Sequence, residues 1–145
     1  MKISTKGRYA LRMMIDLAQH KDGGYVALKD IAERQQISKK YLEQIIPLLS
    51  RSELLRANRG FQGGYMLARP ADKITLAEIL TLTEGSLAPV SCLERPENDC
   101  PRAAECMTLP VWKGLYDVIL NYLEGTTLQD IIDNSRSVQA DNYCI

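Results

Sequence analysis

The sequence contains a single histidine, His20, and this scarcity limits the chemistry that the chain could perform. A Ser-His-Asp or Cys-His catalytic arrangement needs a histidine beside its nucleophile, and no pattern around His20 indicates one. A nucleotide-binding fingerprint and paired carboxylates in a recognisable setting are also missing. The sequence therefore does not favour an enzyme.

Long apolar runs are absent as well. Lys2, Lys6, Arg8 and Arg12 interrupt the apolar residues at the N-terminus before the core of a secretory signal could form. No other run approaches the length of a membrane span. We therefore expect a cytoplasmic chain with no membrane partner, whose four cysteines are free, metal-bound or redox-active rather than disulfide-bonded.

The chain also lacks net charge, because 18 Lys and Arg balance 18 Asp and Glu. The charges are nevertheless unevenly distributed. Residues 1–70 hold 13 Lys and Arg against 6 Asp and Glu, a net +7, and residues 71–145 hold 5 against 12, a net −7. A basic half joined to an acidic half predicts that a polyanion binds the first half.

Apolar residues recur at helical spacing in three segments of the basic half. The first expected helix follows Ser4 and ends before residue 22, the second spans residues 28–35, and the third begins at Lys39 with Ser38 as its cap. Pro47 removes a backbone hydrogen bond inside the third helix, which predicts a bend or an early stop there.

The second and third of these helices, joined by a tight turn, are typical of a helix-turn-helix. In that motif the second helix enters the major groove, where residues near its N-terminus reach base edges and phosphates. We therefore expect double-stranded DNA as the partner. The alternative is a charged face that only contacts solvent. The residues on the free side of this helix are Lys39, Lys40, Tyr41, Glu43 and Gln44.

A hairpin is predicted next, with strands over residues 54–58 and 65–68 and a glycine-rich turn between them. Glycines such as Gly60 allow close approach to a partner, and Arg59 at the tip is placed to enter a DNA minor groove. A phosphate-binding nucleotide loop would need a helix directly after the glycines, whereas a strand follows here.

The acidic half begins with a helix from Leu76, capped by Thr75 and closed by Gly85, followed by a long loop over residues 86–109. This loop holds Cys92, Cys100 and Cys106 in the spacing C-x7-C-x5-C. Three soft thiolates on one flexible segment suit an iron-sulfur cluster or zinc, although unrelated surface thiols remain the alternative.

A long helix over residues 111–124 carries two apolar stripes. One stripe covers its own subunit, and we expect the other to form a homodimer that sets two recognition helices one DNA turn apart on a pseudo-palindromic operator. The alternative is a monomer in which both stripes lie in the core. A last short helix and a polar, mobile tail over residues 135–145 complete the chain.

Three separated motifs carry a family resemblance: residues 1–12, Tyr41-Leu-Glu-Gln44, and Arg59-Gly60 with Gly63-Gly64-Tyr65. Together they resemble the IscR, NsrR and CymR group of winged-helix transcription regulators, over nearly the whole chain. The resemblance places Lys39, Lys40, Tyr41 and Glu43 on the recognition helix and Arg59 on the minor-groove wing.

The expected fold class is therefore mainly α with a small β wing. A winged helix-turn-helix DNA-binding domain and linking helix would span residues 1–84, and a cysteine-rich cluster-binding loop residues 85–109. The dimerisation helix and a short helix would span residues 110–134, and a flexible tail residues 135–145.

The resemblance also sharpens the interpretation of the cysteines. Members that sense iron-sulfur status or nitric oxide carry three cysteines in this loop, whereas CymR-like regulators of cysteine metabolism lack them. This implies an iron-sulfur cluster, of 2Fe–2S type, on Cys92, Cys100 and Cys106. A cluster-free regulator in which these residues act as thiol switches or zinc ligands is the alternative.

The fourth ligand is left open by the sequence. IscR-like proteins place a histidine three residues after the third cysteine, and Leu109 stands there in this chain. Other relatives use a residue of the partner's first helix, where this chain has Arg8 and Arg12. The remaining donors are Glu97, Asp99, Glu105, Cys144 and an external thiol or water. His20 and Cys144 are more simply explained as a helix-end histidine and an unpaired tail thiol.

Overall fold

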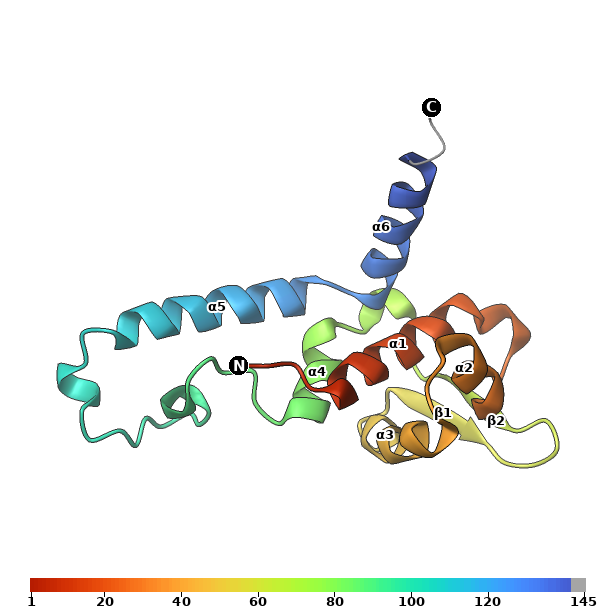
Figure 1. Cartoon of the computed structure of the whole chain (residues 1–145), viewed down its shortest axis with the longest axis horizontal. Coiled ribbons are helices and arrows are strands. Elements are labelled where there is room, and N and C mark those ends of the chain that lie inside the picture. The colour runs from red at the N-terminus through yellow and green to blue at the C-terminus, as the bar shows by residue number, and fades with distance from the viewer. Residues whose placement is uncertain (142–145) are drawn as a thin grey trace.

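The computed structural model describes residues 1–141 and consists mainly of helices (Figure 1). The helices are α1 (Thr5–Gln19), α2 (Leu28–Gln35), α3 (Lys39–Arg51), α4 (Leu76–Glu84), α5 (Leu109–Gly125) and α6 (Leu128–Asp141). The strands β1 (Leu55–Asn58) and β2 (Gly64–Leu67) form one antiparallel hairpin, with Leu55 opposite Leu67. The expected fold class is thus confirmed. Across residues 1–141, no helix has both the length and the apolar character needed to span a membrane.

Side-chain caps fix the starts of several helices where the sequence predicts them. Ser4 Oγ accepts a hydrogen bond from the backbone N–H of Gly7 at 3.1 Å, and Ser38 Oγ accepts one from Tyr41 at 3.1 Å. Thr75 and Glu78 form a reciprocal capping box at the start of α4. Each cap satisfies backbone donors that the first turn of a helix leaves free, so the boundary is determined locally.

A buried carboxylate joins the first two helices. Asp16 of α1 is 1% exposed, and it accepts hydrogen bonds from Arg34 Nε at 3.0 Å, Arg34 Nη2 at 2.7 Å and Gln35 Nε2 at 2.9 Å. Burial raises the pKa of Asp16, but the hydrogen bonds from Arg34 and Gln35 and the charge of Arg34 outweigh it and hold the pKa below its usual value. The orientation of α2 on α1 is thereby specified.

The hydrophobic core extends from α1, α2 and α3 to the first turns of α6, because Leu128 and Ile132 are buried in the same cluster as Met13 and Leu42. Backbone hydrogen bonds hold this junction: Leu76 N–H donates to Thr126 O at 2.9 Å and Leu128 N–H to Ile74 O at 3.0 Å. The start of α6 therefore packs on the body formed by α1, α2 and α3, while α5 and the cysteine loop extend away from it (Figure 1).

The structure corrects two expectations about helix ends: the early stop, one of the two outcomes expected at Pro47, does not occur, and the last helix is longer than expected. Helix α3 does not stop at Pro47 but continues to Arg51, since Pro47 is exposed while Ile46 and Leu49 on either side are buried and hold the last turn on the core. Helix α6 continues to Asp141, where a short helix and an irregular tail were expected from residue 135. Residues 133–141 contain no glycine or proline to end it, and residues 133–140 are exposed. Cys144 lies outside the described residues.

The Asp16 contact generates a prediction on stability. We expect Asp16→Ala to lower the free energy of unfolding by about 1–3 kcal/mol, because it removes the three hydrogen bonds from Arg34 and Gln35 that join α2 to α1. Chemical denaturation at neutral pH measures the loss, with Asp22→Ala as the control, since Asp22 is exposed in the turn after α1.

The difference in the free energy of unfolding between wild type and Asp16→Ala should also depend on pH. A carboxylate whose folded pKa lies below its unfolded value stabilises the protein fully above about pH 4, and this contribution is lost as the pH falls through the folded pKa. A difference that stays constant into the acid range would show that Asp16 acts by packing rather than by charge.

Candidate nucleic-acid interface and cysteine loop

The N-terminal half of α3 presents polar side chains to solvent. Lys39, Lys40, Glu43 and Gln44 are all exposed, as the helical spacing predicts. Tyr41 differs because it is half-buried, with its ring edge-on to the ring of Tyr9 at a centroid distance of 5.2 Å. The structure therefore leaves four of the five expected residues free and uses Tyr41 in part to fix α3 on α1.

The wing is held to the rest of the molecule at the end of β2 nearest its turn. Tyr65 of β2 exchanges two backbone hydrogen bonds with Val26, each at 2.8 Å, and Gly64 approaches the Val26 carbonyl so closely that no Cβ would fit. Arg59 and Gly60 follow β1 and are exposed, and Gly60 has a φ of 123° that favours glycine. The wing thus carries Arg59 outward on a pinned hairpin.

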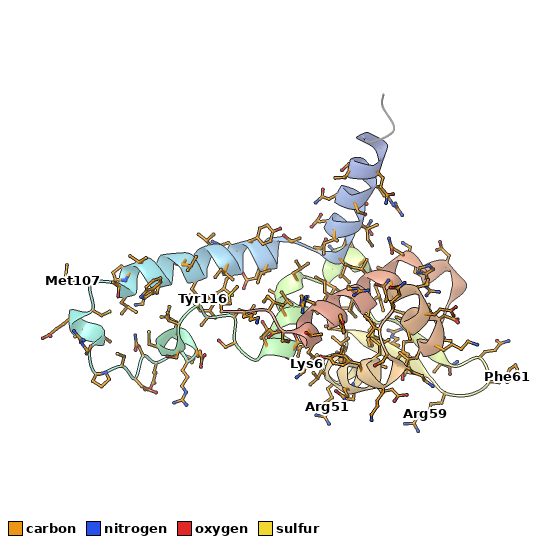
Figure 2. The ribbon with its side chains drawn as sticks, in the orientation of Figure 1. Lys6, Arg51, Arg59, Phe61, Met107 and Tyr116 are labelled. Atoms are coloured by element: carbon orange, nitrogen blue, oxygen red, sulfur yellow. The ribbon has the colours of Figure 1, made fainter. Side chains whose placement is uncertain are left out.

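Further basic side chains lie near these residues. In Figure 2, Arg51 from the last turn of α3 and Arg59 from the wing point out of the molecule on the same side. Arg56 on β1 is exposed too. No sequence pattern singles out Arg51, because its position relative to the wing depends on tertiary packing. The added charge favours a polyanionic partner on this side.

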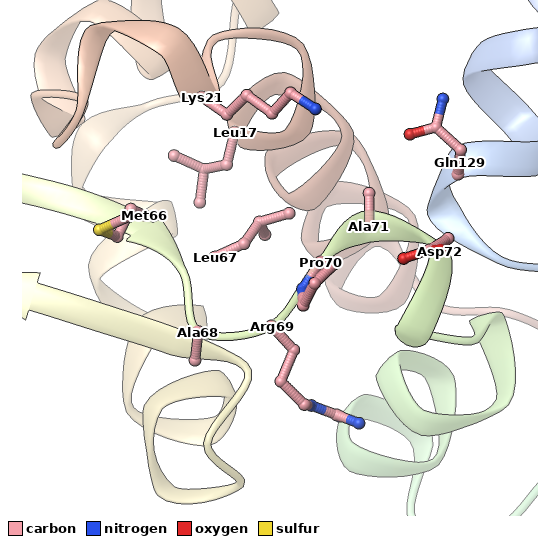
Figure 3. A pocket seen from close by; sticks show the side chains of 10 residues that line it. All are labelled: Leu17, Lys21, Met66, Leu67, Ala68, Arg69, Pro70, Ala71, Asp72 and Gln129. Atoms are coloured by element: carbon pink, nitrogen blue, oxygen red, sulfur yellow. The ribbon is translucent and has the colours of Figure 1, made fainter.

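A separate hollow lies where the wing rejoins the body (Figure 3). Leu17 and Leu67 line it, with Lys21 and Gln129 at its edge, so that α1, the segment after β2 and α6 all contribute. None of the residues expected to contact DNA lines this hollow. We assign it no part in the DNA face.

The cysteine loop contains two short 3-10 turns, η3 (Ser91–Leu93) and η4 (Ala103–Glu105), and all three of its cysteines are half-buried. Cys92 and Cys100 line one shallow hollow together with Glu97 and Asp99. Cys106 does not line it. Within residues 1–141, no three His, Cys, Asp or Glu side chains come close enough to hold a metal ion, so the loop brings together two of the three expected ligands.

The environment of Cys106 favours its thiolate form. Its Sγ lies 3.4 Å from Thr108 Oγ1, and this contact, backbone N–H groups of Thr108 and Leu109 and the charge of Arg102 lower the pKa of the thiol. Thiolates are the ligands that iron-sulfur clusters and zinc prefer, so the donor types fit either group. Binding by all three requires the loop to close around the site.

The fourth-ligand candidates separate in space. Glu97 and Asp99 line the hollow of Cys92 and Cys100, whereas Glu105 does not. His20 lies at the end of α1, where its Nδ1 is 2.7 Å from Asp16 O. Arg12 of α1 hydrogen-bonds to Gln35. Among the described donors of this subunit, Glu97 and Asp99 are the best placed.

The start of the cysteine loop is tied to the start of α1. Glu84, the last residue of α4, accepts hydrogen bonds from Ser4 Oγ at 2.8 Å and from the Ser4 backbone N–H at 3.3 Å. Gly7 leaves room for this carboxylate, since a Cβ there would collide with Glu84. The last residue of α4 is thus hydrogen-bonded to the residue that caps α1.

Helix α5 has one covered and one free apolar stripe. Leu123 is buried with Leu76 and Leu80 of α4, and Tyr116 and Ile119 pack against the same cluster. The second stripe is exposed and consists of Val111 (60%), Leu115 (44%), Val118 (65%) and Tyr122 (67%). The expectation that α5 would bury one stripe within its own subunit agrees with this arrangement.

These features define the class of the protein. A recognition helix with a free basic N-terminal half, a preceding helix held at a tight turn and a pinned hairpin beside them make a winged helix-turn-helix protein of the kind that binds DNA. The chain belongs to the Rrf2 family, whose sequence model, described as an iron-dependent transcriptional regulator, matches residues 3–134. The protein is accordingly a transcription regulator and not an enzyme.

Individual relatives agree with this assignment. The chain is 41% identical to a helix-turn-helix-type transcriptional regulator of Neisseria meningitidis over 145 aligned positions, covering 96% of this chain and 97% of the relative. The solved structure of CymR, the global cysteine regulator of B. subtilis, is 36% identical with a TM-score of 0.76, covering 92% of this chain and 98% of CymR. The structure of T. potens IscR is 39% identical with a TM-score of 0.76, covering 96% of this chain and 91% of IscR.

Proposed function

We propose that the protein is a homodimer that binds pseudo-palindromic DNA through α3 and the wing, and that an iron-sulfur cluster on Cys92, Cys100 and Cys106 controls this binding. The observation that carries the proposal is the division of the molecule into two ends. The exposed basic residues of α3 and the wing lie at one end, and the cysteine loop and the free stripe of α5 extend from the other (Figure 1).

In this proposal α3 lies in the major groove. Lys39 and Lys40 in its first turn contact phosphates at the groove edge, and Glu43 and Gln44 one turn further along reach base edges. Tyr41 combines a groove contact with its packing on Tyr9. Arg59, supported by Gly60, enters the flanking minor groove, where the potential is most negative.

The free stripe of α5 supports the homodimer. Four large apolar side chains at successive turns of α5 form an exposed stripe that is unusual for an isolated monomer. In a two-fold symmetric dimer, the same stripe of a second copy would cover it. Two α3 helices would then face one duplex, and the required half-site spacing is about one helical turn of DNA.

The cluster would act through the contact between Glu84 and Ser4. In this proposal, closing the loop so that Cys106 joins Cys92 and Cys100 would shift the segment that connects Glu84 to Cys92, and Glu84 bonds to the start of α1. A cluster supplies redox and ligand sensitivity when bound, and it shifts DNA affinity only to the extent that it binds the two loop arrangements differently. Glu97 and Asp99 are the proposed oxygen donors for the fourth position.

A second candidate is a cluster-free regulator that uses its cysteines as thiol switches or zinc ligands in cysteine or sulfur metabolism. Two observations favour it: Leu109 occupies the position of the histidine ligand, and the fold superimposes on CymR as well as on IscR. The lowering of the Cys106 pKa by its contacts with Thr108 would serve a thiol switch equally well.

The phosphate contacts are tested by Lys40→Ala. We expect the slope of log affinity against log salt concentration to become shallower by about one unit per subunit. Each phosphate that loses its lysine contact keeps about one counterion that binding would otherwise release. Titrations of duplex DNA at several salt concentrations give the slope, with Lys73→Ala as a charge-matched control at an exposed position outside the proposed face. An equal change in both variants would mean that only net charge matters.

The dimer is tested by Val118→Glu. We expect the dimer dissociation constant to rise by roughly tenfold or more, because the change buries an unpaired charge in an apolar interface. Sedimentation velocity measures it, and Lys113→Glu, about half a helical turn away from the exposed stripe, is the control. Identical oligomeric states for both variants would remove the stripe from the interface.

The cluster is tested by single Cys→Ser changes after anaerobic iron and sulfide reconstitution. We expect Cys92→Ser, Cys100→Ser and Cys106→Ser each to lose the visible chromophore, because a hydroxyl is a poor substitute for a thiolate, and Cys144→Ser to retain it. Colourless, iron-free wild-type protein would eliminate the cluster in favour of the second candidate. Loss of the chromophore in Cys144→Ser would instead identify the fourth ligand.

A further inference from the structure

Phe61 stands at the tip of the wing with its ring fully exposed, at 106% of the reference accessible area, and it is the only phenylalanine in the chain. A single exposed apolar side chain is ordinary on a protein surface and needs no function. The position of this one is different, because it follows Arg59 by two residues on the element that projects farthest from the body on that side (Figure 2).

The loop beneath the ring is built to hold one conformation. The N–H of Gly63 donates to Gly60 O at 3.0 Å, closing a turn around Phe61 and Gln62. A Cβ on Gly63 would lie 2.6 Å from Asn58 O and 2.8 Å from Gly60 O, so the turn is tight enough to require glycine. Because Tyr65 of β2 is bonded to Val26 close to this turn, the wing presents the ring outward on a preorganised support.

We propose that Phe61 contacts DNA directly, as an apolar wedge placed against a base step in the minor groove beside Arg59. This inference rests on the proposed docking of the wing on DNA. Apolar side chains at such positions partly unstack a base step and widen the groove, and flexible pyrimidine-purine steps such as TA deform at the lowest cost. Phe61 would therefore favour operators whose flanking base step unstacks easily, without any hydrogen bond from the ring to a base.

The charge of the wing favours DNA over an apolar protein partner. Residues 55–67 contain Arg56 and Arg59 and no acidic residue, so the ring emerges from a positively charged hairpin. If Arg59 enters the minor groove and contacts phosphates or sugars there, Phe61, two residues further along the wing, reaches the same groove. Docking of the ring on another protein is kept as an outcome of the test.

The experiment compares Phe61→Ala with Gln62→Ala, a matched change at the next exposed residue, and with Arg59→Ala. The DNA is a duplex selected from a random-sequence pool by the wild-type protein, together with versions that carry TA or a stiff AA step at the site flanking the recognition half-site. We expect Phe61→Ala to weaken binding to the TA duplex roughly five- to a hundredfold, with a smaller loss on the AA duplex. Gln62→Ala should bind both as wild type does.

Two further readouts separate a direct contact from an indirect one. The slope of affinity against salt should be unchanged in Phe61→Ala, since no ion pair is lost, and should become shallower in Arg59→Ala if that residue also contacts phosphate. A 2-aminopurine placed in the flanking step should brighten when wild-type protein binds, reporting unstacking, and should stay dark with Phe61→Ala.

Wild-type affinity and fluorescence in Phe61→Ala, with weakened binding in Arg59→Ala, would overturn the wedge and leave the wing contact standing. Wild-type DNA affinity in both Phe61→Ala and Arg59→Ala, while Lys40→Ala still makes the salt slope shallower, would overturn the wing contact itself. A shallower salt slope in Phe61→Ala would show that the ring only positions Arg59. Unchanged DNA binding together with lost association between copies of the protein in Phe61→Ala would place the ring in a protein interface instead.

Discussion

The carboxylate of Asp16 sets the arrangement on which the DNA-binding face depends. A buried charge is stable only while its partners stay in place, so displacing α2 would leave Asp16 without Arg34 and Gln35. Gln35 ends α2 one residue before Gln36, which adopts a left-handed conformation at the turn into α3. The ion pair therefore fixes the turn, and the turn fixes the direction in which α3 presents Lys39 and Lys40.

Helix α1 carries this constraint to the other end of the molecule. Asp16 lies near its C-terminus, Tyr9 packs on the recognition helix from its middle, and Ser4 at its N-terminus holds Glu84. One helix thus contacts the recognition unit and the residue that precedes the cysteine loop. A rearrangement of the loop reaches α3 through a continuous helix rather than across the hydrophobic core, which gives the proposed cluster control a physical route.

Features determined by neighbouring residues could be predicted from the sequence, and features determined by packing could not. Ser38 and Thr75 mark helix starts because a cap is a local hydrogen bond. The fate of the helix beyond Pro47 depends on the burial of Leu49, and the half-burial of Tyr41 depends on Tyr9. The cysteine loop has no periodicity, so its sequence identifies three thiols but not that Cys106 lies apart from the other two.

Helix α4 is bonded at one end to the segment after α5 and at the other end to the start of α1, and this determines what a dimer would do to DNA binding. Leu76 at the start of α4 bonds to the residue after α5, and Glu84 at the end of α4 bonds to the residue that caps α1. The segment made of the cysteine loop and α5 therefore leaves from one end of α4 and returns to the other. Leu123 packs α5 onto α4 as well. A rotation of paired α5 helices must therefore turn α4, and with it α1 and the attached α3. In the proposed dimer, the angle at which α5 crosses its partner would set the spacing of the two recognition helices on DNA, and a loop that changed this angle would change which operators fit.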